Sequence, residues 1–117
     1  MIQDSIISGD GFIDPYLITN YFHTTIEDVS YFTGVYLNTL KNSYRSRDYK
    51  SQSRLCAVIN IISKLTLWTN SDQLSYSWYR NVHVPAFGGL TAEHIVRQGN
   101  IEILERYIEH LTADGYA

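Results

Sequence analysis

The 117-residue chain has few of the features that mark a special compartment or a membrane protein. It contains one cysteine, Cys56, so it cannot form an internal disulfide, and the aliphatic residues around it favour a buried, unreactive thiol. No apolar run is long enough to span a bilayer, and the first residues lack the basic and apolar segments of a signal peptide. We therefore expect a cytoplasmic protein that makes no use of a membrane.

An excess of positive charge is also missing. The formal net charge is -3 and the sequence pI is about 5.7, so bulk electrostatics gives no general attraction to nucleic acid, and any such binding must come from a local patch. Hydrophobic residues make up 44% of the chain and charged residues 18%, which predicts a real core in one compact domain or two small lobes.

The usual signatures of an active site are absent as well. The four histidines fall in separate segments, and the chain has no Cys-x-x-Cys pair and no Gly-x-Ser-x-Gly elbow. Glu105 and Glu109 are one helical turn apart, but they belong to a polar face, where solvated carboxylates are expected. We expect no catalytic residues, no metal site and no cofactor.

Residue types that cap helices divide the first half into short segments. Asp14 and Pro15 predict one helix start, and the segment 24–27, Thr-Thr-Ile-Glu, fits a capping box that opens the next helix. Gly34 ends that helix, and a third short helix is expected at residues 35–42.

The second half is also helical in its pattern. Residues 51–69 form the longest predicted helix, which is apolar most of the way round and should be buried. A helix with Leu74 and Trp78 one turn apart on its apolar side should follow, then a loop and two more helices. Their expected N-caps are Asn70–Asp72, Thr91 and Asn100. Strand signals are weak, so we predict an all-α protein, a compact bundle of about six or seven short helices.

Two segments have no helical pattern. Residues 1–13 contain Gly9 and Gly11 and are expected to be a loop or a frayed end. Residues 43–53 are polar and non-periodic, which makes them the best linker candidate. We accordingly divide the chain into an N-terminal region, residues 1–50, and a C-terminal domain, residues 51–117.

The second and third predicted helices are typical of a helix-turn-helix. Ser30 and Gly34 have the small-x-x-x-Gly spacing of two closely crossing helices, and basic residues are concentrated between Lys41 and Arg54. If this unit binds DNA, the residues free to face a groove or the phosphates are Tyr36, Asn38, Thr39, Lys41, Arg45 and Arg47. The alternative is a plain three-helix packing unit with a solvated, charged linker.

The segment from Leu55 to Ala117 resembles one protein family, the toxin-binding domain of the MbcA/ParS/Xre antitoxins. The resemblance consists of a Trp helix, a Pro-x-Phe-Gly-Gly loop before a short Gly-ended helix, and a last amphipathic helix with a Gly-Tyr-Ala end. The residues that carry it are Trp68–Ser71, Tyr76–Arg80, Val84–Glu93, Val96–Gly99 and Gly115–Ala117. The N-terminal part is similar only to a reduced version of the family's DNA-binding domain.

The resemblance implies a function. Members of the family neutralise RES-type toxins, which consume NAD or transfer ADP-ribose from it, by covering the toxin's active site. They are typically homodimers, and many repress their own operon. The toxin-binding residues that it implies here are Trp78, Phe87, Gly88, Gly89, Arg97, Gly115, Tyr116 and Ala117. The other reading is a helix-turn-helix DNA-binding regulator without a toxin partner.

Several of these residues also allow a purely structural interpretation. Gly88 and Gly89 precede a helix and could hold an anion or simply form a tight turn, and Phe87 could be an exposed anchor or a core plug. Trp78 fits the core as well as an interface. Tyr116 could enter a cleft made for an aromatic, anionic ligand such as NAD, or could belong to a frayed end without a role.

Overall fold

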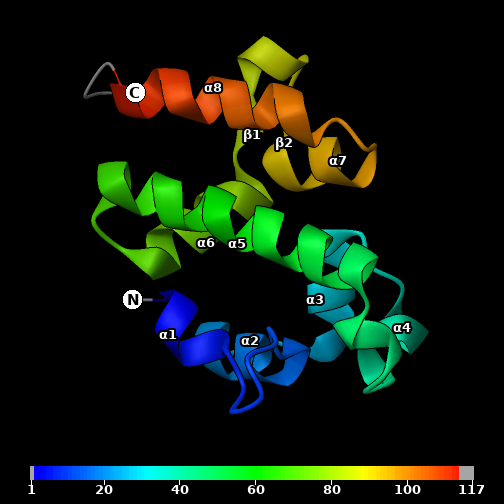
Figure 1. Cartoon of the computed structure of the whole chain (residues 1–117). Helices are drawn as coiled ribbons and strands as arrows, with labels where there is room; N and C mark the ends of the chain where they lie inside the picture. Colours follow the sequence, from blue (N-terminus) through cyan, green and yellow to red (C-terminus); the bar gives the residue numbers. More distant parts are fainter. Residues whose placement is uncertain (1, 114–117) are drawn as a thin grey trace. The chain divides into compact units, whose positions relative to one another are not determined.

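The computed structural model describes residues 2–113 and is helical apart from one pair of two-residue strands (Figure 1). Eight α-helices are present in the described part of the chain. The predicted all-α fold is therefore confirmed. The chain divides into two compact units, Met1–Ile59 and Asn60–Ala117, with the boundary inside the longest helix, α5 (Tyr49–Thr69).

The first unit begins with a helix that the sequence did not predict. α1 (Ile2–Ile6) occupies the stretch expected to be a loop, and Ile2 and Ile6, one turn apart, are buried. The backbone then turns through a loop closed by an isolated bridge between Ile7 and Ile13. Gly9 and Gly11 shape this loop only, so the expectation of an irregular leader was wrong for the residues before them.

The predicted cap of α2 is correct, whereas the cap of α3 lies one residue after the predicted one. Asp14 caps α2 (Pro15–Phe22) by accepting from the Tyr16 amide at 2.9 Å, with proline in the first turn. Thr25 caps α3 (Ile26–Thr33) by accepting from the Asp28 amide at 3.1 Å. The carboxylate at the start of α3 is that of Asp28 and not the expected Glu27. It accepts a hydrogen bond from the Thr24 hydroxyl at 2.7 Å.

The remaining part of the first unit shows that residues 43–53 are not an irregular linker. After α4 (Leu37–Lys41) comes a single 3₁₀ turn, η1 (Arg45–Arg47), and α5 begins at Tyr49. The polar Gln52 joins this segment to the rest of the unit: its side chain bonds the Ile13 amide and carbonyl, each at 2.9 Å, and the Ser46 carbonyl at 2.8 Å. Gln52 thus binds backbone groups on both sides of this segment within the unit.

The second unit contains the later part of α5 and three further helices. They are α6 (Asp72–Asn81), α7 (Ala92–Arg97) and α8 (Ile101–Ala113). Between α6 and α7 lie β1 (His83–Val84), a 3₁₀ turn η2 (Pro85–Phe87) and β2 (Leu90–Thr91). The strands are antiparallel, with His83 opposite Thr91 and Val84 opposite Leu90. The core of the second unit includes Tyr79, Val84, Val96, Leu104 and Ile108.

The buried side of α6 is one residue away from the predicted one. Leu74 is 60% exposed and Trp78 is only partly buried, whereas Ser75 and Tyr79 are fully buried. A buried serine is tolerated here because its hydroxyl is shared with those of Thr66 at 3.0 Å and Thr69 at 2.7 Å. Hydrophobicity alone could not reveal a polar residue that is satisfied by neighbouring hydroxyls.

Cys56 also departs from expectation. The apolar stripe of α5 is buried as predicted, with Leu55, Val58, Ile62 and Leu65 inaccessible to solvent. Cys56 lies on another side of the helix and is exposed. Within the described residues, no helix combines the length and apolar character that crossing a bilayer requires.

Candidate functional site

A hollow of about 210 Å³ lies on the second unit, and we call it the aromatic groove. Its walls come from the end of α5, from α6, from the β1–η2 segment and from α8. The lining residues are Trp68, Trp78, Val82, Val84, Pro85, Tyr107 and Leu111. The groove therefore combines residues that are spread over more than forty positions of the sequence, and it is lined by three aromatic rings and no charged side chain.

The two tryptophans form one wall of the aromatic groove. The rings of Trp68 and Trp78 meet edge to face, with centroids 6.2 Å apart and planes at 84°. Both side chains are partly exposed, so Trp78 is neither a core plug nor a fully solvated anchor. This ring contact holds the two indoles in a defined geometry while leaving apolar surface available.

The glycine loop beside the aromatic groove is a closed turn. The Gly88 amide donates to the Pro85 carbonyl and the Gly89 amide to the Val84 carbonyl, both at 3.0 Å. Both glycines have positive φ, 66° and 85°, which other residues adopt only with strain. Because both amides have backbone partners, they do not form an anion cradle. Of the two readings of this pair, the structure supports the turn.

Phe87 connects the same loop to the last helix. Its ring lies 5.0 Å from that of Tyr107 on α8, at an interplanar angle of 59°, and its side chain is half-buried. Tyr107 also lines the aromatic groove. The loop is thereby fixed against the wall of the groove.

A charged pair holds α6 and α7 together. The Arg80 Nε donates to the Glu93 carboxylate at 2.7 Å, and its Nη1 donates to the Tyr76 hydroxyl at 3.1 Å. The Arg80 and Glu93 side chains are only 20% and 11% exposed. Burial alone would lower the pKa of Arg80, but the bonds to the Tyr76 hydroxyl and the Glu93 carboxylate raise that pKa above its usual value. Nothing in the sequence pairs these charges, because they lie on different helices.

The structure brings together part of the predicted toxin-binding set. Trp78 lines the aromatic groove, and Phe87 touches a residue that lines it, while Arg97 is exposed at the end of α7. The predicted tail residues Gly115, Tyr116 and Ala117 lie outside the described residues. Sequence reasoning missed Tyr107 and Leu111, although their spacing of four on an amphipathic helix was a usable signal.

The predicted DNA-binding residues belong to the first unit, and the structure divides them into two groups. One hollow brings together Tyr36, Asn38, Thr39 and Arg45, together with Leu37. Lys41 and Arg47 line a different hollow, which Phe12, Asp14 and neighbouring residues complete. The six residues therefore line two different hollows of the first unit.

Arg47 already has partners within its own unit. Its guanidinium forms an ion pair with Asp10 and lies 5.4 Å above the ring of Phe12. The Ser8 hydroxyl, by donating to Asp10, and then the charge of Arg47 hold the pKa of Asp10 below its usual value. Arg47 is therefore paired with the loop before α2, and its contact with a nucleic acid stays a prediction.

The turn between α3 and α4 has the geometry of a capped helix end. Gly34 has φ 78°, and its amide donates to the Ser30 carbonyl at 3.0 Å. The Ser30 hydroxyl donates to the Val35 carbonyl at 2.6 Å, which fixes the chain as it leaves α3. The Ser30–Gly34 spacing thus forms a cap. The helix that follows, α4, has only five residues against the predicted eight.

Comparisons of the chain with protein-family models, with curated proteins and with solved structures found no match. No group of three or more His, Cys, Asp or Glu side chains among residues 2–113 is arranged to hold a metal ion.

Proposed function

We propose that this protein is a non-catalytic antitoxin that binds and neutralises a RES-type toxin, which consumes NAD or transfers ADP-ribose, by covering its active site. The observation that carries the proposal is the aromatic groove of the second unit, which presents Trp68, Trp78 and Tyr107 on one surface. Trp and Tyr are the residues that most often dominate binding energy in protein interfaces. The groove belongs to the segment that resembles the toxin-binding domain of the MbcA/ParS/Xre antitoxins.

The size of the aromatic groove favours a protein partner. Pockets for small molecules and cofactors typically enclose about 300–1,000 Å³. A hollow of about 210 Å³ is smaller and accommodates one or two side chains of a partner. A shallow apolar recess of this size suits an antitoxin, because an antitoxin binds the surface of a partner protein and does not enclose a substrate.

The walls of the aromatic groove are preorganised. The Arg80–Glu93 pair joins α6 to α7, the closed glycine loop fixes the β1–η2 segment, and the Phe87 ring contact holds that loop to α8. A preformed surface avoids much of the entropy loss that accompanies the ordering of side chains on binding. In our proposal the end of the chain, residues 115–117, enters the toxin's NAD cleft while the groove holds the surrounding surface, and the antitoxin acts as a homodimer that represses its own operon.

Co-expression with the protein encoded by the adjacent gene, which the proposal requires to be a RES-type toxin, tests the proposal. Growth arrest by the toxin should be relieved by the unchanged chain, and the two proteins should co-purify. Trp78→Ala should weaken the complex by roughly 30-fold or more, as expected for loss of a hot-spot aromatic. Leu74→Ala is the matched control, because Leu74 is an exposed apolar residue on the same helix that does not line the groove.

Equal affinity of the Trp78→Ala and Leu74→Ala variants would refute a role for the aromatic groove, provided that both variants have unchanged circular dichroism. Removal of Tyr116 and Ala117 tests the tail separately. Neutralisation that survives this truncation would exclude the tail from the mechanism, even if the groove still binds.

A second candidate function is DNA binding by the α3–α4 segment. The observation that favours it is the wide hollow where the exposed Tyr36 and Asn38 lie with Arg45, with no carboxylate among its lining residues. In a gel-shift titration with the upstream DNA, Arg45→Ala should weaken binding, and Arg47→Ala should weaken it less because that side chain is paired with Asp10. Binding that does not weaken as salt rises would count against phosphate contacts.

A further inference from the structure

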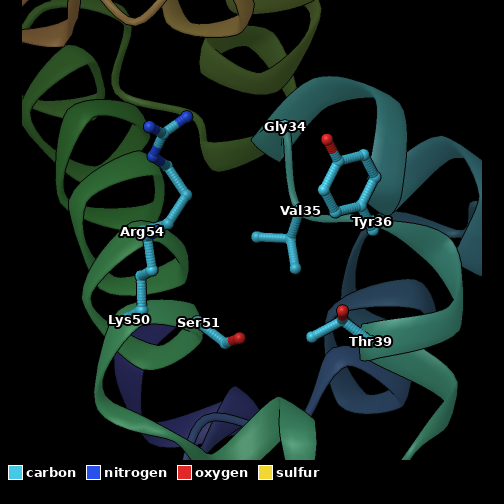
Figure 2. Close-up of a pocket in the computed structure, with 7 residues that line it drawn as sticks. All are labelled: Gly34, Val35, Tyr36, Thr39, Lys50, Ser51 and Arg54. Carbon is cyan, nitrogen blue, oxygen red and sulfur yellow. The ribbon is translucent and has the colours of Figure 1, made fainter.

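A second hollow of about 240 Å³ lies in the first unit, between the α3–α4 turn and the first turns of α5 (Figure 2). We call it the basic pocket. Lys50 and Arg54, one turn apart on α5, supply two positive charges on the same side, and Thr39 and Tyr36 lie opposite them (Figure 2). The seven residues that line the pocket include no carboxylate.

One buried hydroxyl in the basic pocket lacks a protein partner. Ser51 is only 6% exposed, and Figure 2 shows its hydroxyl directed from α5 into the space that faces Thr39. Within residues 2–113 the only hydrogen bond of Ser51 outside the helix ladder is made by its amide, which donates to Asp48 at 2.9 Å. A hydroxyl removed from bulk water and open only to a pocket is a group expected to be satisfied by a ligand or a bound water.

The two positive charges of the basic pocket differ in their bonding to the protein. The Arg54 Nη1 donates to the Thr33 carbonyl at 3.3 Å, which holds the guanidinium at the end of α3. The Lys50 ammonium has no ion pair within the described residues. The nearest carboxylate along the chain, that of Asp48, accepts from the Ser51 amide and does not line the pocket.

We propose that the basic pocket binds a phosphate group. A phosphate monoester carries a charge of about -1.5 to -2 and three strong acceptor oxygens, which suits the Lys50 ammonium and the hydroxyls of Ser51 and Thr39, while the Arg54 guanidinium, which lies at the Gly34 end of the pocket in Figure 2, adds positive charge there. A carboxylate, with a single charge and two oxygens, would leave part of this donor set unused. The pocket is too small to enclose a whole nucleotide cofactor but accommodates one phosphate.

The phosphate can come from two sources, a phosphodiester of a DNA backbone or a free phosphate or phosphomonoester. The proposal does not depend on the toxin-binding function, since Lys50, Ser51 and Arg54 belong to the first unit. Its DNA source would add a backbone contact to the second candidate function. Neutralisation of a toxin should be the same for Lys50→Gln and for the unchanged chain, which separates failure of this proposal from failure of the antitoxin function.

Titration of the full ¹⁵N-labelled chain with inorganic phosphate, at an ionic strength held constant with sodium chloride, tests the site. We expect amide shifts at Gly34, Thr39 and Ser51. Lys50→Gln should weaken phosphate binding at least about tenfold and Ser51→Ala about fivefold. Lys64→Gln is the matched control, because it removes the same charge from a lysine of the second unit that does not line the basic pocket.

A fluorescence-anisotropy titration with a mixed-sequence DNA duplex distinguishes the sources. Loss of duplex affinity in Lys50→Gln, with competition by inorganic phosphate, would assign the pocket to a phosphodiester. Phosphate binding in the pocket with duplex binding absent or unchanged by Lys50→Gln would assign it to a free phosphate or phosphomonoester. The proposal is overturned if inorganic phosphate produces no shifts in the pocket, or if Lys64→Gln weakens phosphate binding as much as Lys50→Gln.

Discussion

Replacing Glu93 with alanine removes the carboxylate that Arg80 binds on α7 and leaves a guanidinium that is largely withdrawn from solvent. The Arg80 and Glu93 side chains are 20% and 11% exposed and are joined by a bond of 2.7 Å. Removing one member of a fully buried ion pair costs about 3–5 kcal/mol, because the other charge stays in a poorly solvated place. Because this pair retains some contact with water, we expect Glu93→Ala to lower the free energy of unfolding by about 2–3 kcal/mol.

The assay is urea unfolding followed by tryptophan fluorescence. Both tryptophans of the chain, Trp68 and Trp78, lie in the second unit, so this signal reports on the unit that contains the pair. Glu109→Ala is the control: it breaks the bond from Lys64 at 3.2 Å, whose members are 42% and 63% exposed. Exposed pairs contribute about 0–1 kcal/mol, so the control should be close to the unchanged chain.

The reasoning is refuted if Glu93→Ala is no more destabilising than Glu109→Ala. A double variant that also carries Arg80→Ala provides a further check. If burial of the unpaired guanidinium is the main penalty, the double variant should be less destabilised than the sum of the two single variants. Additive effects would show that the two side chains contribute independently.

Three further predictions concern single residues. Gly89→Ala should destabilise the second unit by about 1–2 kcal/mol in the same urea assay. The cause is backbone strain, because the φ of Gly89 is 85° although a Cβ would meet no atom within 4 Å; an unchanged unfolding midpoint would contradict it. Arg47→Ala should raise the pKa of Asp10 part of the way to its usual value in an NMR titration. The Asp10 carboxylate stabilises the fold above its usual pKa and loses this contribution as pH falls through its folded pKa, so the variant should have a smaller contribution. An unchanged pKa of Asp10 would contradict the ion pair. Thr91→Ala should lower the thermal midpoint by an amount equivalent to about 1 kcal/mol, because it removes the N-cap of α7, and Thr91→Ser should restore most of it.

Local signals in the sequence indicated where four of the helices begin. Asp14, Ser71 and Thr91 cap α2, α6 and α7 as predicted, Thr25 caps α3 one residue after the predicted position, and Gly34 ends α3 as expected. These signals work because a cap involves only residues within three or four positions of each other, so the tertiary structure has little opportunity to change them.

The aromatic groove could be predicted only in part. The sequence indicated Trp78 and the loop around Phe87, because a proline, an aromatic residue and two glycines in succession predict an ordered turn. It did not indicate which of these residues would meet Tyr107, since that contact joins η2 to α8 across about twenty positions and depends on how the helices of the second unit pack.

The basic run from Lys41 to Arg54 could likewise be predicted only in part. Its composition predicted a locally positive region, but Lys50 was expected in a linker before the helix that contains Arg54. Only the folded structure assigned Arg47 to Asp10, left Lys50 at the basic pocket and buried the Ser51 hydroxyl beside it. The physical reason is that charge is a property of the side chain, whereas its partner is whatever the packing of other elements brings within a few ångströms.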